Sequence, residues 1–285
     1  MSECIKTFTF LSITYNHEAY ILEHLESILA LIKNYGAGID FHLVLMDDCS
    51  SDSTVTIARE WLEDNKAFYH YQLVTRDKNV GTVQNIIEGL KRVTTDAFKH
   101  LAGDDVFLDE NIFEVFNHME QRLYISKTVP FGGGSKKTRW FLAQIHDLAK
   151  YAESRGRFKD VQRIYNLIAA PGVFFPVSFL EDGLYTFLED YYLMEDIPMW
   201  YYFLQVKGYD ATVLDKSYVG YRIGQGISSA STHEKAKAYV EDIKKASYEL
   251  DMKAYQRPFI INPHMYFVVW QWIKSKIHKR NKRTL

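Results

Sequence analysis

A strand followed by a helix, repeated four times within the first 120 residues, constrains the fold of this chain more than any other feature. Each unit opens with a short apolar run and continues into a segment with the start signals or apolar spacing of a helix. The apolar runs are TFTFLSIT (7–14), FHLVLM (41–46), YHYQLV (69–74) and FKHLA (98–102). Because right-handed crossovers place such strands side by side in parallel, the pattern predicts an α/β fold with a mostly parallel sheet and helices on both faces.

The pattern changes after residue 125. The expected elements are a mobile loop over FGGGSKKT (131–138), a helix over the charged segment 141–168, extended segments over GVFFPVSFL (172–180) and YDATVLD (209–215), and a helix over 233–255. No internal repeat or linker divides the chain cleanly. We therefore expect one large α/β unit over residues 1–230 and a helical C-terminal extension over residues 231–285.

Composition and charge exclude several classes of protein. The chain carries 34 Lys and Arg against 36 Asp and Glu, a net charge of −2, so no overall positive field would attract nucleic acid. Its 2 cysteines are too few for a disulfide framework, which fits a reducing compartment. No stretch reaches about 18 consecutive apolar residues, and the N-terminus lacks a signal-peptide core. We therefore expect a cytoplasmic protein without a spanning helix.

Polar side chains gather where each predicted strand ends. They are Thr14, Tyr15, Asn16 and Glu18 after the first strand, Asp47 and Asp48 after the second, Arg76 and Asn79 after the third, and Asp104 and Asp105 after the fourth. Each cluster alone also fits a turn or a helix cap. Ligands of open parallel sheets bind at the carboxyl ends of the strands, so the four clusters together predict a nucleotide or phosphate site.

The type of phosphate site follows from what the strand ends contain. The dinucleotide pattern G-x-G-x-x-G is absent after the first strand, and no G-x-x-x-x-G-K-[ST] loop occurs. The strand ends carry carboxylates instead. A carboxylate repels a diphosphate unless a divalent cation lies between the two groups. Mg²⁺ or Mn²⁺ held by one or two carboxylates and by substrate phosphates is an established arrangement. The sequence therefore predicts a metal-bound diphosphate.

A second acidic pair, Glu195 and Asp196, precedes Pro198 and an apolar helical run in LMEDIPMWYYF. One interpretation is structural, because acidic residues and proline favour the first turn of a helix. The other is catalytic, because transfer of a group to a hydroxyl requires a base that takes the proton. The residues alone leave both interpretations open.

An ordered series of segments resembles glycosyltransferase family 2, whose members are inverting enzymes of the GT-A nucleotide-diphospho-sugar fold. The segments are TFLSITYNHEAYI, VLMDDCSSDST, NVGTVQNIIEGL, FKHLAGDDVFLDE, MEDIPMW and YRIGQGISS, and they span residues 7 to 229. Within the family, the series is similar to bacterial enzymes that extend surface polysaccharides such as O-antigen or capsule.

The resemblance implies a role for each candidate residue. The base and ribose end of the donor would be lined by Thr14, Tyr15, Asn16, Glu18, Asp47, Asp48, Arg76 and Asn79. GDD takes the place of the family's D-x-D motif, in which the first aspartate is replaced by Ala102. Metal binding would then rest on Asp104, with Asp105 supporting it or contacting the sugar.

The resemblance also implies the catalytic residues. Asp196 would be the general base, and Glu195 would help to position the acceptor or the base. Arg222 would reach the diphosphate, with Ser228 or Ser229 nearby.

The resemblance further implies the partners and the division of the chain. The donor would be a nucleoside-diphosphate sugar, UDP-linked, with Mn²⁺ or Mg²⁺, and the acceptor a saccharide carried on a polyprenyl diphosphate. Residues 1–120 would form the donor-binding half and residues 121–230 the acceptor and catalytic half.

Three other readings stay open from the sequence. A sugar-phosphate nucleotidyltransferase has a similar fold, but its glycine-rich loop after the first strand is missing. A retaining transferase would not need Asp196 as a base, and a non-catalytic scaffold would not need either acidic pair.

The C-terminal segment MYFVVWQWI (265–273), followed by the basic KSKIHKRNKR (274–283), fits either a last helix packed on the core or an anchor at the membrane surface.

Overall fold

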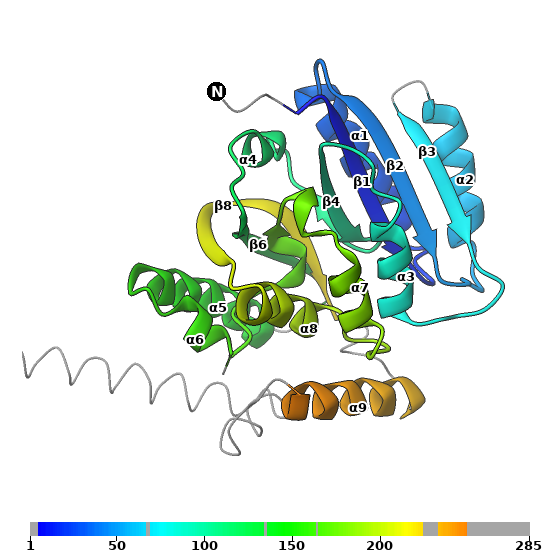
Figure 1. Cartoon of the computed structure of the whole chain (residues 1–285). Coiled ribbons are helices and arrows are strands. Elements are labelled where there is room, and N and C mark those ends of the chain that lie inside the picture. The colour runs from blue at the N-terminus through cyan, green and yellow to red at the C-terminus, as the bar shows by residue number, and fades with distance from the viewer. Residues whose placement is uncertain (1–4, 67–68, 134–135, 164, 225–232, 250–285) are drawn as a thin grey trace, which may run out of the picture.

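The predicted parallel sheet forms the first half of the protein. The computed structural model describes residues 5–66, 69–133, 136–163, 165–224 and 233–249 (Figure 1). The strands are β1 (Thr7–Thr14), β2 (Asp40–Asp47), β3 (His70–Thr75) and β4 (Ala97–Ala102), in the order β3-β2-β1-β4. All three strand pairs are parallel. The expectation of an α/β fold with a largely parallel sheet is confirmed.

Strand register aligns the carboxyl ends of the sheet. Thr14 of β1 pairs with Asp47 of β2, and Asp47 pairs in turn with Thr75 of β3. On the other side of β1, Ile13 pairs with Ala102 of β4. The four strands therefore stop at the same level, and the polar residues that follow them share one rim.

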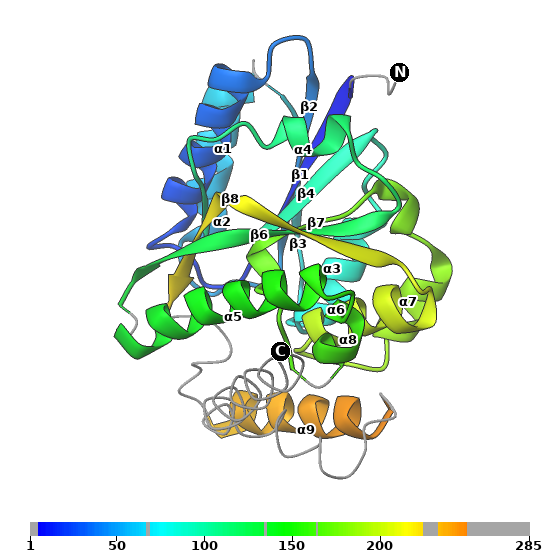
Figure 2. The same ribbon diagram turned by 90° about the vertical axis from the view of Figure 1, so that its left-hand side faces the viewer.

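Helices cover both faces of this sheet. They are α1 (Ile21–Tyr35), α2 (Thr54–Asn65) and α3 (Thr82–Leu90). Figure 2 shows α1 and α2 on one side of the strands and α3 on the other. Phe10 of β1 belongs to the same buried cluster as Leu25 of α1, whereas the next residue, Leu11, belongs to a second cluster with Ile86 of α3. Neighbouring strand residues point to opposite faces, so the continuous apolar runs serve two separate cores.

A second sheet stands beside the first. Its strands are β5 (Val106–Phe107), β6 (Arg122–Gly132), β7 (Val173–Phe174) and β8 (Asp210–Ile223), in the order β5-β8-β6-β7. The β6–β8 pair is parallel, and the β5–β8 and β6–β7 pairs are antiparallel. The long strand β6 was not expected from the sequence. The extended segment expected over 172–180 holds only β7, because Pro176 has no N–H to continue a ladder and a 3₁₀ turn follows at Val177–Phe179.

The predicted loop over 131–138 is wrong at both ends. Strand β6 continues to Gly132, and helix α5 begins at Lys136. Gly132, the last residue of β6, adopts a left-handed φ of +81°. Arg139 of α5 donates hydrogen bonds to the carbonyl oxygens of Pro130 and Gly132, at 2.8 and 2.6 Å. The start of α5 is therefore bonded directly to the end of β6.

The remaining helices follow residue 112, and α5 packs on β6 and β8 of the second sheet. They are α4 (Phe113–Asn117), α5 (Lys136–Ser154), α6 (Phe158–Gln162), α7 (Asp182–Leu188), α8 (Asp196–Tyr201), which continues as a π-helical turn over Tyr202–Val206, and α9 (His233–Glu249). The single helix expected over 141–168 is broken in two, because Gly156 takes a left-handed φ of +63° between α5 and α6. The helix expected over 233–255 is present as α9, and residues 250–255 lie outside the described part.

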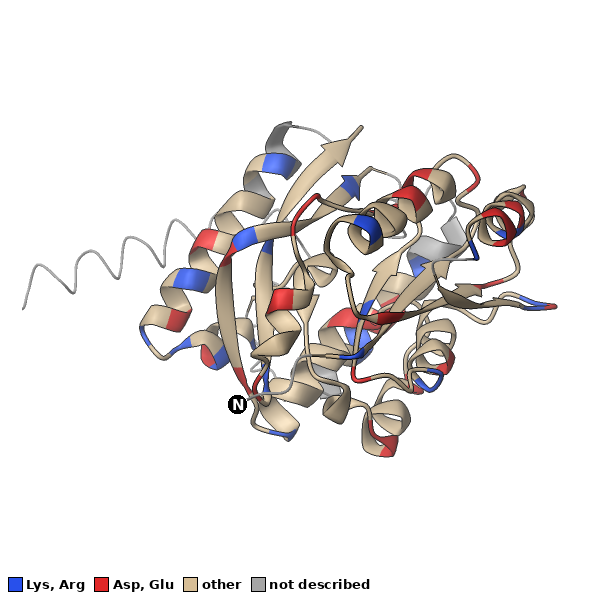
Figure 3. Ribbon diagram, turned by 90° about the horizontal axis from the view of Figure 1, so that it is seen from above, with Lys and Arg blue, Asp and Glu red and all other residues tan. Residues whose placement is uncertain are grey.

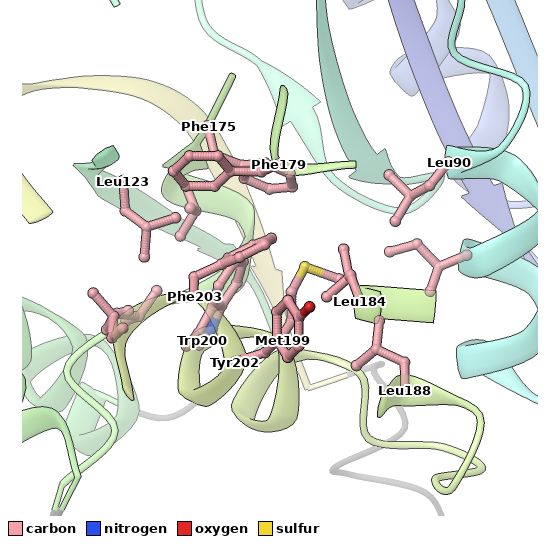
Figure 4. Close-up of a cluster of buried hydrophobic side chains, with 14 of the residues drawn as sticks. Leu90, Leu123, Phe175, Phe179, Leu184, Leu188, Met199, Trp200, Tyr202 and Phe203 are labelled. Atoms are coloured by element: carbon pink, nitrogen blue, oxygen red, sulfur yellow. The ribbon is translucent and has the colours of Figure 1, made fainter. Parts of the chain in front are cut away.

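The apolar core beneath α8 fixes the helix that carries the second acidic pair. Figure 4 shows Met199, Trp200 and Phe203 pointing toward Phe175 and Phe179. Trp200 is 1% exposed and Phe203 is fully buried. The rings of Phe179 and Phe203 lie 4.9 Å apart at an angle of 47°. A large aromatic core of this kind holds the backbone of α8 in one position.

Surface properties agree with the composition. Figure 3 shows basic and acidic residues interspersed over the elements seen from above. Among the residues that the structure describes, no helix is both long enough and apolar enough to cross a lipid bilayer. The tail expected to pack on the core or to anchor the chain at a membrane, residues 265–283, lies outside the described residues. The division of the chain after residue 230 stays a prediction.

Candidate active site at the carboxyl rim

The loops after β1 and β2 are tied to each other. Asn16 adopts a left-handed φ of 55°, and its Oδ1 accepts a hydrogen bond of 2.8 Å from the backbone N–H of Ser51. The backbone N–H of Asn16 donates to Ser50 Oγ at 2.8 Å. Glu18 accepts a hydrogen bond of 2.9 Å from the backbone N–H of Ser53. Asn16 and Glu18 therefore shape the first side of the rim, and Asn is one of the few residues that tolerates this backbone conformation.

The loop after β2 is tied in turn to the loop after β3. Asp47 accepts a hydrogen bond of 2.8 Å from the backbone N–H of Ser50. Asp48 accepts hydrogen bonds of 2.8 and 2.9 Å from the backbone N–H groups of Val80 and Gly81. Burial raises the pKa of Asp48, and these two hydrogen bonds act against that rise. Both aspartates thus hold loop backbone.

Arg76 and Asn79 also engage neighbouring loops. The Nε of Arg76 donates to Asn85 at 3.1 Å, and its guanidinium pairs with Glu88 at 3.0 Å. Asn79 donates to the carbonyl oxygen of Asp48 at 3.0 Å. These contacts place both residues at the same edge as the aspartates, where they stiffen the third loop.

Two buried polar atoms near the turn after β4 have no hydrogen-bond partner among the described residues. They are Thr14 Oγ1 and His17 Nδ1. Both lie beside Gly103, where an added Cβ would be 3.1 Å from His17 Nδ1 and 3.2 Å from Thr14 Cβ. Burial lowers the pKa of His17, and the nearby Asp104 carboxylate raises it. Buried polar atoms without partners are costly, so their position indicates a ligand or a bound water at this point.

Asp104 and Asp105 have different surroundings although they are adjacent. Asp104 is 7% exposed, and its carboxylate accepts no hydrogen bond within the described part of the chain. The Asp105 carboxylate accepts a hydrogen bond of 2.7 Å from the backbone N–H of Arg222. Burial and the neighbouring Asp104 raise the pKa of Asp105 well above its usual value. Asp104 is the carboxylate available to a ligand, and Asp105 holds the second sheet.

Arg222 is brought to the aspartates by β8. Its Nε donates a hydrogen bond of 2.7 Å to the carbonyl oxygen of Asp104, and its guanidinium pairs with Glu23. The guanidinium lies 4.4 Å from the centre of the Tyr20 ring and 4.3 Å from that of Phe131. Two aromatic faces and a carboxylate therefore fix the orientation of Arg222 at the rim. Ser228 and Ser229 lie outside the described residues.

Two buried basic side chains beneath Asp105 were missed from the sequence. His24 Nδ1 donates to the carbonyl oxygen of Asp105 at 2.7 Å, which leaves Nε2 to accept from Ser12 Oγ at 2.7 Å. Burial lowers the pKa of His24 to about 4, so this imidazole is neutral. Lys99 is 2% exposed, and burial lowers its pKa to about 7. The signal for Lys99 was a lysine inside the apolar run FKHLA.

Glu195 and Asp196 stand at the start of α8. Burial, followed by the neighbouring Asp196, raises the pKa of Glu195 to about 8. Burial also raises the pKa of Asp196, while a hydrogen bond of 2.7 Å from the backbone N–H of Ile197 to Asp196 Oδ1 lowers it. The pair is therefore a site where one carboxyl keeps a proton more easily than an exposed acid would.

Tyr221 connects the two acidic pairs. Burial raises the pKa of its hydroxyl, and the carboxylates of Asp105, Asp196, Asp104 and Glu195 raise it further. All four acids therefore lie within electrostatic range of one buried hydroxyl on β8. Tyr221 was not among the site residues predicted from the sequence, although this residue directly precedes Arg222.

The residues at the rim fit a cation only in part. Within the described ranges, no group of three His, Cys, Asp or Glu side chains is arranged to hold a metal ion. Asp104 has an uncommitted carboxylate, and a neighbouring histidine nitrogen has no partner. Mg²⁺ in nucleotide sites is commonly held by one or two carboxylates and by phosphate oxygens. The arrangement therefore fits a cation that is shared with a bound diphosphate.

Comparisons with known proteins agree with this geometry. The chain is similar to the crystal structure of S. aureus TarS 1–349 in complex with UDP-GlcNAc, with a TM-score of 0.55 and 18% identity over 90% of this chain and 70% of that chain. It is also similar to the mannosyltransferase PcManGT from Pyrobaculum calidifontis in complex with GDP-Man and Mn²⁺, with a TM-score of 0.54 and 13% identity over 90% of this chain and 68% of that chain. These likenesses show a shared GT-A fold.

A comparison with curated protein sequences gives no match. The model of the family described as Glycosyl transferase family 2 matches residues 9–179, which is more than half of the 285 residues. The resemblance seen in the sequence is thereby confirmed, and the chain belongs to glycosyl transferase family 2.

Proposed function

We propose that the protein is an inverting glycosyltransferase that moves a sugar from a nucleoside-diphosphate donor, a UDP-sugar, to a hydroxyl of a saccharide acceptor. The observation that carries this proposal is the carboxyl rim, where His17 Nδ1 and the Asp104 carboxylate have no hydrogen-bond partner among the described residues. The acidic pairs 104–105 and 195–196 both act electrostatically on Tyr221 of β8. One pair suits the diphosphate end of a donor and the other suits an acceptor hydroxyl.

Donor binding is assigned to the rim formed by the first three strand ends. Thr14 Oγ1 and His17 Nδ1 are buried and have no partner in the part of the chain that the structure describes, so both have hydrogen-bonding capacity for a ligand. Tyr15, Asn16, Glu18, Asp47, Asp48, Arg76 and Asn79 form the remaining wall for base and ribose. The bound UDP-GlcNAc of TarS and the bound GDP-Man of PcManGT support a nucleotide-sugar donor.

The diphosphate is assigned to Asp104 and Arg222. Asp104 would hold Mn²⁺ or Mg²⁺ together with the phosphate oxygens, with Asp105 in support, and the bound cation supplies charge neutralisation for the departing nucleoside diphosphate. Arg222 lies at the same place with its guanidinium oriented by two rings, where it can bind a phosphate oxygen.

Proton transfer is assigned to the second acidic pair. Asp196 accepts the proton of the acceptor hydroxyl as that oxygen attacks the anomeric carbon of the sugar. Glu195, whose pKa is raised to about 8, stays protonated at neutral pH and donates a hydrogen bond that orients the acceptor or Asp196. Attack from the face opposite the diphosphate inverts the configuration, so an α-linked donor gives a β-linked product.

The acceptor is assigned to the class of saccharides carried on polyprenyl diphosphate, in the synthesis of a bacterial surface polysaccharide. The order of the family segments in the sequence supports this class, and a lipid-linked acceptor would make contact between the basic tail at 274–283 and the inner face of the membrane useful. Full-length protein should then bind anionic vesicles more strongly than a chain ending near residue 257.

The test is a calorimetric screen of nucleotide sugars with and without Mn²⁺, followed by product analysis with the bound donor and a panel of saccharide acceptors. We expect one nucleotide sugar to bind in a Mn²⁺-dependent manner and a product of inverted configuration. Retained configuration would identify a retaining transferase, and formation of nucleotide sugar from sugar phosphate a nucleotidyltransferase. Binding without transfer or donor hydrolysis would leave a non-catalytic scaffold.

A further inference from the structure

The C-terminal helix α9 is bonded to the loop that leads into the second acidic pair. Asp242 of α9 is 7% exposed, and one of its oxygens, Oδ2, accepts hydrogen bonds from three successive backbone N–H groups. The donors are Tyr192 at 3.1 Å, Leu193 at 2.6 Å and Met194 at 3.0 Å. Glu195 is the next residue, so the last backbone groups before the acidic pair are all directed at this carboxylate.

Other contacts of α9 reinforce this attachment. Lys245 donates a hydrogen bond of 2.7 Å to the carbonyl oxygen of Asp190, and it pairs with the Asp190 carboxylate at 3.2 Å. Ala246 is fully buried. In contrast, Glu241 is exposed, and its ion-pair partner within the described part of the chain is Lys244 on the same helix, at 3.0 Å. The side of α9 that carries Asp242 is therefore the side that meets the loop.

The opposite side of the same loop meets the donor rim. The carbonyl oxygen of Tyr192 accepts a hydrogen bond of 3.2 Å from the backbone N–H of Val83, at the start of α3. Gly81 has a φ of +87°, and a Cβ there would lie 2.6 Å from the Tyr192 carbonyl oxygen. The Tyr192 hydroxyl donates to Asn79 at 3.4 Å. The loop is thus clamped between the donor rim and α9.

Loss of Asp242 would remove one half of this clamp. Three neighbouring N–H groups would lose their common acceptor, and charge-assisted hydrogen bonds of this kind are among the stronger contacts in proteins. The core side of α8 would stay packed, whereas the segment before it would be free to shift. A general base must lie within hydrogen-bond reach of the proton it takes, so a small shift there affects proton transfer more than donor binding.

We propose that Asp242 is a positioning residue for Glu195 and Asp196, which makes the C-terminal helix a working part of the active site. The proposal rests on the proposed glycosyltransfer. The Asp242 charge also reaches Glu195 itself, as one of the causes that raise the Glu195 pKa. Among the described residues, the Asp242 carboxylate accepts hydrogen bonds only from backbone N–H groups, so its effect on catalysis would pass through the position of the acidic pair.

The experiment compares the variants Asp242→Ala and Asp242→Asn in the full chain, with Glu241→Ala as the matched control on the exposed side of α9. We expect kcat for sugar transfer to fall by roughly 10- to 100-fold in Asp242→Ala, while the Kd for UDP with Mn²⁺ changes less than about twofold. Asparagine keeps an oxygen acceptor, so Asp242→Asn should recover a large part of kcat. Amide hydrogen exchange at Tyr192, Leu193 and Met194 should be faster in Asp242→Ala and unchanged in Glu241→Ala.

Two results would overturn the positioning role. One is a kcat of Asp242→Ala equal to that of the control. The other is a fall in kcat that follows only a loss of folded protein, with UDP binding reduced equally and Asp242→Asn no better than Asp242→Ala. Failure of the wild-type chain to transfer any sugar would instead contradict the proposed function, and in that case the exchange data still report whether Asp242 holds the loop.

Discussion

The backbone N–H of Arg222 donates a hydrogen bond of 2.7 Å to Oδ1 of Asp105, across 117 residues of sequence. Arg222 Nε also donates to the carbonyl oxygen of Asp104. These two bonds join the end of β8 to the turn after β4, so the second sheet is attached to the first at the acidic pair itself. Asp105 thereby has a structural role as well, and Asp104 is the member of the pair to which we assign the main contact with the donor's cation.

The replacement Asp196→Asn should lower kcat by about 10²- to 10⁴-fold, because asparagine cannot accept the proton of the acceptor hydroxyl. The Kd for UDP should stay close to that of the wild type, since the proposed mechanism assigns Asp196 to the acceptor and not to the donor. Steady-state transfer assays and calorimetry measure the two quantities. Glu189→Gln, an exposed acid just before the same loop, is the matched control. A kcat near wild type in Asp196→Asn would contradict its role as the base.

The replacement Asp104→Ala should weaken donor binding in the presence of Mn²⁺ and leave the weaker, metal-free binding almost unchanged. Asp104 has the carboxylate at the rim that is not committed to backbone, so its loss removes the protein's main hold on the cation. Calorimetric titration of UDP with Mn²⁺ and with chelator measures both states. Glu60→Gln on the exposed side of α2 serves as control. Equal Mn²⁺ dependence in Asp104→Ala and wild type would refute the metal assignment.

The pH dependence of stability should change in Glu195→Gln. The pKa of Glu195 is raised in the folded protein to about 8, from an ordinary value of 4.5. The folded state therefore holds this proton more tightly than the unfolded state, and the associated stability is lost as pH rises from the ordinary pKa toward 8. Glutamine does not titrate, so thermal unfolding should show Glu195→Gln gaining stability relative to wild type between pH 5 and pH 8. A constant difference across that range would count against the raised pKa.

The replacement Gly81→Ala should destabilise the protein more than Gly38→Ala. Both glycines have positive φ values, +87° and +82°, so alanine is strained at either position, and the ψ of 159° at Gly81 lies in a region that is essentially confined to glycine. Only the Cβ at residue 81 would collide with another group, the Tyr192 carbonyl oxygen at 2.6 Å, whereas the Cβ at residue 38 meets nothing within 4 Å. We expect the free energy of unfolding to fall by roughly 2–4 kcal/mol for Gly81→Ala, with kcat also reduced. Urea titration of both variants provides the comparison, and equal values would show that Tyr192 moves freely.

The first sheet could be predicted from the sequence because the signals for its strands are local. Each parallel strand is an apolar run that ends in polar residues, and the common level of Thr14 and Asp47 follows from parallel pairing. Asp104 and Arg222 were expected near each other only through a family resemblance, since no local pattern links residues so far apart.

The remaining features depend on long-range contacts. Strand β6 was missed because it ends at a run of glycines that indicated a loop. Lys99 and Tyr221 could not be identified as candidate site residues from the sequence, because the carboxylates that act on them come from other parts of the chain. In the sequence, Asp242 is one of several acidic residues on a charged helix. Its role depends on three backbone N–H groups that lie about 50 residues earlier in the chain.

The pairing of β1 with β2 runs residue for residue from Thr7–Asp40 to Thr14–Asp47. Phe10 and Leu11 belong to cores on opposite faces of the sheet. Deletion of one residue within β1 would therefore turn the side chains on one side of the deletion to the wrong face. It would also move Thr14 by about 3.3 Å along the strand, away from the rim. The chain should accordingly accept many substitutions of similar size in β1 but no change in its length. In related sequences, insertions and deletions should therefore fall in the connections between elements. The number of residues in β1 should stay the same.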